Sequence, residues 1–374
     1  MSVWSPTVTP VARCGPLTRE PRLRFQSEVI SINDRGTLSM DGAIIGRPAT
    51  ADERSVSTST ETTRMRPCPE FTLQITRMEV GPRGGATGID ALVRHRMIEV
   101  EPGVRLHVAE AGEGPPVILV HGFPEFWYSW RWQIPALAEA GFHVVAPDMR
   151  GYNLSDKPRG VAAYRLPLLT RDIARLVEEC GVERACVVGH DWGAVVAWSF
   201  AMGYHDRLER LAILNVPHPV TFARGLRSPR QLLRSWYVFF FQIPGLPELL
   251  ARSGNYRLLR NALRGSLRRG SFSPQDVERY VEALARPGAL TSSINYYRAL
   301  ERGRRANIRA VRRVDRPVLV VWGEQDAYLG KELADPPREW VPDVRVVRLP
   351  SASHWVQNDE PERVNQVLID FLRG

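Results

Sequence analysis

An aspartate stands between two glycines in the segment Gly-His-Asp-Trp-Gly at residues 189–193. A short apolar run at 185–188 precedes this segment, and an apolar stretch with helical character follows it at 194–202. In such a strand–turn–helix arrangement the central residue is held out at the end of the strand, with a positive φ. Glycines flank it because the strand and helix backbones approach too closely there for a Cβ atom. We therefore predict that Asp191 is presented for chemistry as a nucleophile.

Two further polar residues follow apolar runs later in the chain. Asp326 comes after the run that ends at Trp322, and His354 comes after the run that ends at Leu349. An aspartate after a strand is commonly a turn or helix-capping residue when it stands alone. The chain order of nucleophile, acid and histidine, each at a strand end, instead predicts a catalytic triad of Asp191, Asp326 and His354.

An aspartate at the turn, where serine is usual, changes the expected chemistry. A carboxylate that attacks an sp³ carbon displaces a leaving group and becomes an alkyl–enzyme ester. His354, oriented by Asp326, would then activate the water that hydrolyses this ester. The backbone N–H groups of Phe123 and Trp192 are expected to form the oxyanion hole for that step. These residues point to alkyl electrophiles, either epoxides or alkyl halides, rather than to esters or amides.

Residues near the two loops that would form the oxyanion hole are expected to have structural rather than catalytic roles. Phe123-Pro124 is a candidate cis peptide bond, because X-Pro bonds alone adopt the cis form at a cost of about 1 kcal/mol or less. His121 and His190 flank tight turns, and we expect them to hydrogen-bond to the backbone rather than to transfer protons.

The apolar runs that precede these residues are spaced as strands that alternate with helices. Two antiparallel strands are expected around a turn at 102–103, and buried strands at 117–120, 143–147, 185–188, 211–215, 317–322 and 344–349. Helices are expected at about 132–140, 166–180, 194–202 and 361–372. This alternation is typical of an α/β fold whose mostly parallel sheet is covered by helices on both faces. Ligands bind to such sheets at the carboxyl ends of the strands.

Residues 217–306 interrupt the alternation, because they are Arg-rich, aromatic and helical in character. We expect a helical lid here, inserted between a first part of the core at 95–216 and a second part at 307–374. Residues 1–94 mix Pro, Ser, Thr, Gly and Arg without a sustained helical or strand period. This composition predicts a disordered extension. A targeting or partner-binding tail is one alternative. Another is a start codon assigned too far upstream, since methionines recur at 65, 78 and 97.

Composition excludes several classes of protein. The net charge of +9 comes almost wholly from arginine, and the arginines are scattered rather than interleaved with aromatic residues, so we expect no nucleic-acid partner. The four cysteines lack metal-ligand spacing and predict reduced thiols in a cytoplasmic protein without a metal site. The sequence contains no run of eighteen apolar residues, so we predict no transmembrane helix. Nothing in the composition indicates the oligomeric state.

Arginines at roughly helical spacing mark one face of the expected lid. Contact with an anionic membrane surface is one interpretation, and a solvated helix face is the favoured one. The arginines are Arg257, Arg260, Arg264, Arg268 and Arg269.

Four motifs together resemble the epoxide hydrolases of the α/β-hydrolase superfamily, over about residues 97–374. They are His-Gly-Phe-Pro-Glu at 121–125, Gly-His-Asp-Trp-Gly at 189–193, Gly-Glu-Gln-Asp at 323–326 and Ser-His-Trp-Val-Gln at 353–357. The resemblance implies an α/β-hydrolase fold, an epoxide and water as substrates, and no cofactor or metal. It also implies two lid tyrosines that hydrogen-bond to the epoxide oxygen, at the matching positions Tyr237 and Tyr297. In the family the second of these tyrosines lies directly before an arginine. Tyr297 is therefore the match, and the neighbouring Tyr296 is expected to be a core residue.

The substrate is expected to contact Phe123 and Trp192 as well as these two tyrosines. Aromatic residues at 236 and 239–241 of the lid suggest that it is apolar. A haloalkane or haloacid dehalogenase would use the same triad, with the Trp192 indole as a halide donor. Haloalkane dehalogenases typically add an Asn or Trp donor where Phe123 stands, and fluoroacetate dehalogenases carry arginines where Trp192 and Val195 stand. Both departures favour epoxides. The intact triad disfavours a binding module without activity.

Overall fold

The computed structural model describes residues 30–32, 38–40, 87–264 and 270–374. The chain divides into two compact units, Met1–Arg83 and Gly84–Gly374. In the first unit, strands β1 (Ile30–Ile32) and β2 (Leu38–Met40) pair in antiparallel fashion. Most of the extension expected at residues 1–94 therefore lies outside the described residues.

Regular structure begins before residue 94, the expected end of that extension. Helix α1 (Thr87–Leu92) lies before it, and strand β3 (Arg94–Glu101) begins at it. Val93 is buried, and Asp90 accepts a hydrogen bond from Arg279 at 3.1 Å, so tertiary contacts hold this helix. A helix of six residues is too short to show a helical repeat in the sequence.

An eight-stranded sheet forms the centre of the second unit, in the order β10-β9-β8-β7-β5-β6-β4-β3. Strands β5 to β10 run parallel to one another, whereas β4 pairs antiparallel with β6 and with the edge strand β3. The expected mostly parallel sheet is thus confirmed. Its remaining strands are β4 (Val104–Ala111), β5 (Pro116–Val120), β6 (His143–Pro147), β7 (Ala185–His190), β8 (Leu208–Leu214), β9 (Val318–Gly323) and β10 (Val344–Leu349).

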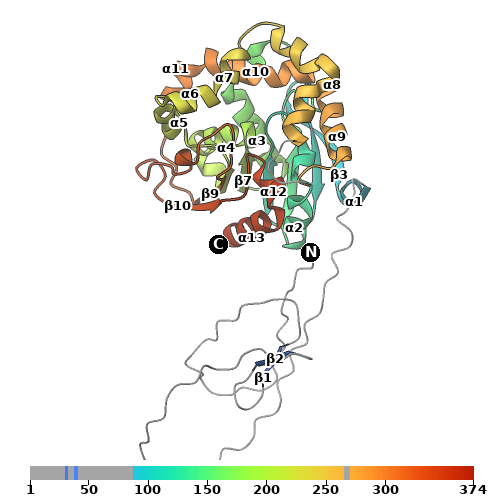
Figure 1. Ribbon diagram of the computed structural model, residues 1–374, viewed down its shortest axis with the longest axis vertical. Helices are drawn as coiled ribbons and strands as arrows, with labels where there is room; N and C mark the ends of the chain where they lie inside the picture. Colours follow the sequence, from blue (N-terminus) through green and yellow to red (C-terminus); the bar gives the residue numbers. More distant parts are fainter. Residues whose placement is uncertain (1–29, 33–37, 41–86, 265–269) are drawn as a thin grey trace, which may run out of the picture. The chain divides into compact units, whose positions relative to one another are not determined.

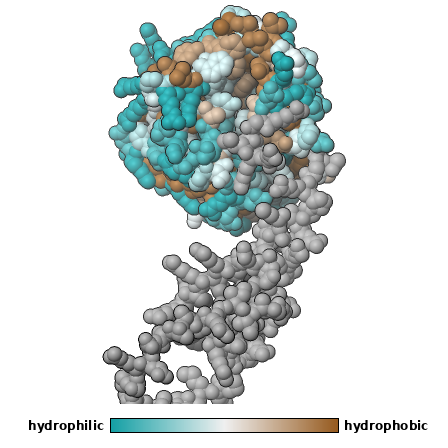
Figure 2. All heavy atoms as spheres, in the orientation of Figure 1, coloured by the Kyte–Doolittle hydropathy of each residue, from teal (hydrophilic) through white to brown (hydrophobic). Residues whose placement is uncertain are grey.

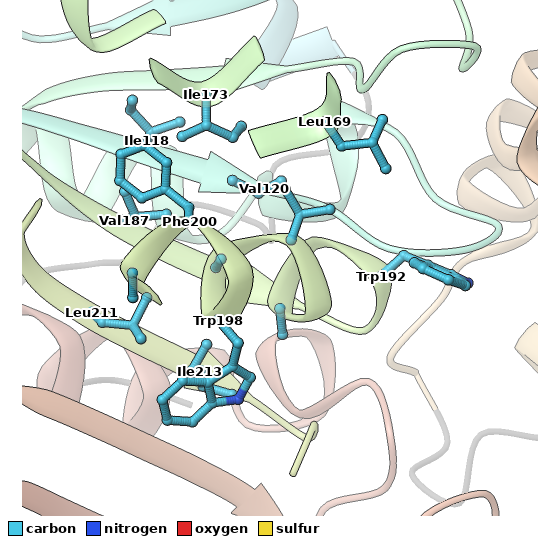
Figure 3. Packing of buried hydrophobic residues seen from close by; sticks show 14 of the residues in the cluster. Ile118, Val120, Leu169, Ile173, Val187, Trp192, Trp198, Phe200, Leu211 and Ile213 are labelled. Atoms are coloured by element: carbon cyan, nitrogen blue, oxygen red, sulfur yellow. The ribbon is translucent and has the colours of Figure 1, made fainter. Parts of the chain in front are cut away.

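Alternate residues of the central strands belong to different hydrophobic clusters on the two faces of the sheet. In β5, Ile118 packs in one cluster and Leu119 in the other. Figure 3 shows Phe200 and Ile173 around Ile118 on the first face. Burial on both faces explains why these strands are continuously apolar in sequence. Helices α3 (Leu166–Glu179) and α4 (Trp192–Gly203) cover the first face, and α2 (Gln133–Glu139) and α13 (Pro361–Arg373) cover the second.

Helices α5 to α11 interrupt the alternation between β8 and β9, and we call this insertion the lid. Figure 1 shows the lid helices together at the top of the view. The last of them passes the expected boundary at 306, because no proline or glycine stops it there. The lid helices are α5 (Pro219–Gly225), α6 (Pro229–Arg234), α7 (Trp236–Phe240), α8 (Leu246–Arg264), α9 (Pro274–Ala285), α10 (Ala289–Arg302) and α11 (Arg304–Arg309).

Short helices complete the second unit. They are the 3₁₀ helices η1 (Trp127–Trp130), η2 (Val161–Tyr164), η3 (His205–Arg207) and η4 (Lys331–Leu333), and the α-helix α12 (Val356–Asp359). Within the described part of the chain, no helix combines the length and the hydropathy needed to cross a membrane.

Candidate active site

Asp191 occupies the turn between β7 and α4, with a φ of 48° and a ψ of −122°. The predicted positive φ is confirmed. A Cβ atom added to Gly193 would lie 1.9 Å from the Val120 carbonyl oxygen, and one added to Gly189 would lie 2.6 Å from the Gly193 oxygen. Close backbone approach therefore requires both glycines. The Asp191 side chain remains 17% exposed.

The structure brings the three predicted triad residues together at the carboxyl ends of β7, β9 and β10. The Nδ1 atom of His354 lies 2.7 Å from Oδ2 of Asp326. Its Nε2 atom lies 3.4 Å from Oδ2 of Asp191. The imidazole therefore stands between the two carboxylates, with one ring nitrogen directed at each.

Three groups besides His354 donate hydrogen bonds to Asp326. Its Oδ1 atom accepts hydrogen bonds from the backbone N–H groups of Tyr328 and Leu329, at 2.7 and 2.9 Å. Its Oδ2 atom accepts another from the Asn215 side chain at 2.8 Å. Asn215 also accepts a hydrogen bond from the Gly323 N–H at 2.8 Å and has a φ of 50°. Sequence reasoning missed Asn215, although its position directly after the buried strand β8 was a usable signal.

Charge stabilises the ionised form of each triad residue. Burial acts to lower the pKa of His354, but the neighbouring Asp326 and Asp191 carboxylates hold that pKa well above 6.5. Burial acts to raise the pKa of Asp191 and of Asp326, and the His354 imidazolium holds both below 3.8. The Phe123 N–H also lowers the pKa of Asp191. The resting site is therefore an imidazolium between two carboxylates.

The loop after β5 supplies the expected backbone donor. The Phe123 N–H donates to Oδ1 of Asp191 at 2.6 Å, and the Phe123-Pro124 peptide bond is cis, as predicted. The Trp192 N–H lies in the first turn of α4, where N–H groups have no intrahelical acceptor. Figure 3 shows Trp192 at the end of this helix, apart from the other labelled side chains.

His121 and His190 are both fully buried and make the expected backbone hydrogen bonds. His121 accepts a hydrogen bond from the Met149 N–H at 2.9 Å, so its other nitrogen donates to the Gly122 carbonyl, also at 2.9 Å. His190 contacts the His354 carbonyl oxygen at 2.8 Å through Nε2. Its Nδ1 lies 2.8 Å from a carboxylate oxygen of Glu125, a pairing that sequence reasoning missed.

The two predicted tyrosines lie next to each other, and Tyr297 also contacts the residue that follows the nucleophile. The ring of Tyr297, on α10, lies 5.9 Å from that of Tyr237, on α7, and 4.9 Å from that of Trp192. Burial first, and then the negative charge of Asp191, raise the pKa of both tyrosines well above 10. Tyr296 instead donates its hydroxyl to the Arg150 carbonyl at 2.7 Å and is fully buried, which is the expected core position.

The lid aromatics divide into two groups. Phe241 contacts Tyr297 and Phe123, with ring centres 4.8 and 5.6 Å apart, and therefore belongs to the site. Trp236 and Phe239 are 60% and 59% exposed and face away from it. This division could not be read from the sequence, because all of these residues fall in one apolar run.

Buried polar contacts fix the lid over the triad. Arg298 donates to both carboxylate oxygens of Glu248, at 2.7 and 3.1 Å, and to the Phe241 carbonyl at 3.0 Å. Gln231 of α6 donates to the Tyr328 carbonyl at 2.8 Å, in the loop that carries Asp326. The two tyrosine-bearing segments are therefore tied to each other, and α6 of the lid is tied to the acid loop.

Two of the four cysteines lie within the described residues. Cys180 and Cys186 are free thiols, and Cys14 and Cys68 lie outside the described residues. Among residues 87–264 and 270–374, no three His, Cys, Asp or Glu side chains are grouped as metal ligands.

Comparison with known proteins agrees with this geometry. A family model described as the alpha/beta hydrolase fold matches residues 115–361. The AB hydrolase superfamily protein YfhM of Bacillus subtilis (strain 168) is 43% identical over 275 residues, which are 73% of this chain and 96% of that protein. Epoxide hydrolase 2 of Caenorhabditis elegans is 37% identical over 285 residues, which are 74% of this chain and 79% of that protein.

Solved structures give the same result. An epoxide hydrolase from Bacillus megaterium, in complex with an inhibitor, aligns with a TM-score of 0.68 and 34% identity, covering 75% of this chain and 100% of the other. Epoxide hydrolase A from Mycobacterium thermoresistibile aligns with a TM-score of 0.67 and 34% identity, covering 75% of this chain and 98% of the other. The chain therefore belongs to the epoxide hydrolases of the alpha/beta hydrolase fold family.

Proposed function

We propose that this protein adds water to an apolar epoxide and releases a vicinal diol, through an alkyl–enzyme ester on Asp191. The observation that carries this proposal is the pair Tyr237 and Tyr297 enclosed with Phe123 and Phe241 beside the nucleophile. An apolar enclosure with two phenol donors suits a substrate that is itself apolar but develops negative charge on one oxygen.

In the first half-reaction, Oδ2 of Asp191 attacks one ring carbon, and the bond from that carbon to the epoxide oxygen breaks. The electron pair goes to the oxygen, where the Tyr237 and Tyr297 hydroxyls stabilise it. After ring opening this oxygen takes the proton that the His354 imidazolium gives up, so the imidazole is neutral before hydrolysis begins. Because the pKa of each tyrosine is raised, both remain protonated donors in the resting enzyme. The ester carbonyl oxygen is then Oδ1, the atom that already accepts the Phe123 N–H.

In the second half-reaction, His354 removes a proton from water, and the resulting hydroxide attacks the ester carbon of Asp191. The developing oxyanion at Oδ1 is stabilised by the N–H groups of Phe123 and Trp192. The bond from the ester carbon to Oδ2 breaks, and Oδ2 leaves as part of the diol with the second proton of the attacking water. The first proton stays on His354, which regenerates the resting imidazolium. The oxygen of water stays in the regenerated carboxylate.

The site suits a neutral substrate better than a haloacid. The charged groups that act most strongly on Asp191 are the histidines His354 and His190, not arginines that would bind a substrate carboxylate. The positions beside the nucleophile, Trp192 and Val195, are apolar. A small haloalkane would still fit the triad chemistry, so the test must separate the two leaving groups.

A single-turnover reaction in ¹⁸O-labelled water, with enzyme in excess over a terminal epoxide, tests the proposal. The expected product is an unlabelled diol, with the ¹⁸O in the Asp191 carboxylate of the peptide that contains residue 191. A labelled diol with an unlabelled enzyme would mean that water attacks the epoxide directly. Halide release from haloalkanes with no diol from any epoxide would assign the protein as a dehalogenase.

A further inference from the structure

Large apolar side chains are exposed mainly in one part of the lid. Of the thirteen exposed large apolar side chains within the described residues, nine lie between Leu232 and Leu258. Eight of these, which we call the lid patch, are Leu232, Leu233, Trp236, Phe239, Ile243, Leu246, Leu249 and Leu250. Scattered exposed leucines are ordinary on a protein surface, but such a concentration marks an interaction surface.

The lid patch follows from the spacing of apolar residues on α6, α7 and the start of α8. They recur every three or four residues, so one side of these helices is apolar although it faces outward. Leu233 and Leu249 are 74% and 68% exposed. Figure 2 shows hydrophobic surface gathered at the top of the molecule, where Figure 1 draws α7 and α8. On α7 the exposed Trp236 and Phe239 flank Tyr237, whose ring contacts that of Tyr297.

The surroundings of the lid patch are strongly basic. Residues 219–263 contain seven arginines, no lysine and a single acidic residue, Glu248. Glu248 is buried and paired with Arg298, so it presents no negative charge to the outside. Exposed arginines stand close in sequence to the apolar side chains and form the arginine border: Arg224, which pairs with Glu339, and Arg227, Arg230, Arg252 and Arg257.

The basic face expected from the sequence is only part of this border. Arg260 pairs with Glu278, and Arg268 and Arg269 lie outside the described residues. The exposed apolar side chains are the additional feature that the structure reveals, and they distinguish this surface from a solvated helix face.

We propose that the lid patch docks on the surface of an anionic lipid bilayer. Leucine, tryptophan and phenylalanine side chains would enter the boundary between headgroups and acyl chains, while the bordering arginines pair with anionic headgroups. A second copy of the chain fits less well, because a self-complementary contact would set the two arginine borders against each other. A nucleic acid would use the arginines but leave the eight apolar side chains exposed. Docking does not depend on the proposed reaction.

Co-sedimentation of the full chain with vesicles tests this proposal. The vesicles are phosphatidylcholine with increasing fractions of phosphatidylglycerol, and no epoxide is present. The expected result is binding that rises with phosphatidylglycerol and weakens with salt. The triple variant L233S/F239S/L249S should lower the partition coefficient at least about tenfold, because three apolar anchors are lost.

A matched triple variant, L92S/M97S/L154S, removes three exposed apolar side chains outside the lid and should bind vesicles as the wild type does. The charge variant R227E/R230E should also weaken binding, whereas R345E/R363E, on the core, should not. Circular dichroism and thermal unfolding establish that each variant is folded.

Three outcomes would overturn the proposal. They are no sedimentation at any phosphatidylglycerol content, equal losses in the lid and core variants, and unchanged vesicle binding in L233S/F239S/L249S. In the last case, a dimer-to-monomer change in that variant, measured by light scattering, would assign the lid patch to a second copy.

Discussion

The Nε2 atom of His354 lies 3.4 Å from Oδ2 of Asp191, close enough for each charge to stabilise the other. The negative charge of Asp191 is one of the causes that raise the pKa of His354. Forming an ester on Asp191 removes that charge, while Asp326 keeps its own. The pKa of His354 should therefore fall when the ester forms, which favours the neutral imidazole that can take a proton from water.

The two half-reactions should consequently differ in pH dependence. Alkylation needs ionised Asp191 and protonated tyrosines, so its rate should fall only when the pH drops below the lowered pKa of Asp191. Ester hydrolysis needs neutral His354, so its rate should rise with pH through a pKa lower than that of the resting histidine. Rapid-quench measurements of both steps across pH check this. A hydrolysis rate that is independent of pH, or falls as pH rises, would contradict it.

Removing either lid tyrosine should slow alkylation alone. Tyr237→Phe and Tyr297→Phe should each lower the alkylation rate about 100-fold, the usual effect of losing one donor to a developing oxyanion. Hydrolysis of the ester should be nearly unchanged. Tyr296→Phe is the matched control, because its hydroxyl bonds to the Arg150 carbonyl. It should keep the alkylation rate and lose about 1 kcal/mol of unfolding free energy. Equal kinetic losses in all three variants would refute distinct roles.

Much of this arrangement could be predicted because it rests on local patterns. Continuous apolar runs identified the buried strands, and Asp191, Asp326 and His354 each lie within five residues after one, so the topology brings them to the same sheet edge. The cis bond at Phe123-Pro124 was likewise a local signal. Helix α1 was missed because six residues carry too little pattern.

Contacts between distant segments could not be predicted in the same way. The pairing of Glu125 with His190 depends on where two loops meet, and the sequence holds no record of that distance. The split between Phe241, which faces the site, and Phe239, which faces outward, depends on how a short helix is rotated. Such rotations are set by tertiary packing rather than by apolar periodicity within one run.

Asn215 should support ester hydrolysis by positioning Asp326. Asn215→Gly keeps the positive φ accessible and removes the hydrogen bond to Oδ2 of Asp326. We expect about a tenfold slower hydrolysis step with an unchanged alkylation rate, and a loss of about 1–3 kcal/mol in unfolding free energy. A shifted pH profile of hydrolysis would show that the effect passes through His354. If both steps slow equally, the side chain is only a structural support.

His218 should make the folded state sensitive to acid. It is fully buried at the start of α5, its Nδ1 accepts the Val220 N–H, and its Nε2 has no hydrogen-bond partner among the described residues. Burial lowers its pKa from 6.5 to about 4. Between these values the unfolded chain binds more protons, so stability is present above pH 6.5 and is lost as the pH falls toward 4, by roughly 3 kcal/mol.

Urea unfolding across this pH range tests the histidine. His218→Asn keeps a capping acceptor for α5 and should remove this part of the pH dependence. His205→Asn changes an exposed histidine and should leave the dependence as it is. An unchanged slope in His218→Asn would contradict the assignment.

Trapping the ester tests the central claim most directly. His354→Ala removes the base for hydrolysis, so incubation with a terminal epoxide should leave the alkyl group on Asp191. The intact mass should increase by the whole mass of the epoxide, and the double variant D191N/H354A should show no increase. An adduct that persists in the double variant, or no adduct with any epoxide, would contradict the account. An adduct equal to a haloalkane minus hydrogen halide, formed only with halogenated compounds, would contradict it in favour of a dehalogenase.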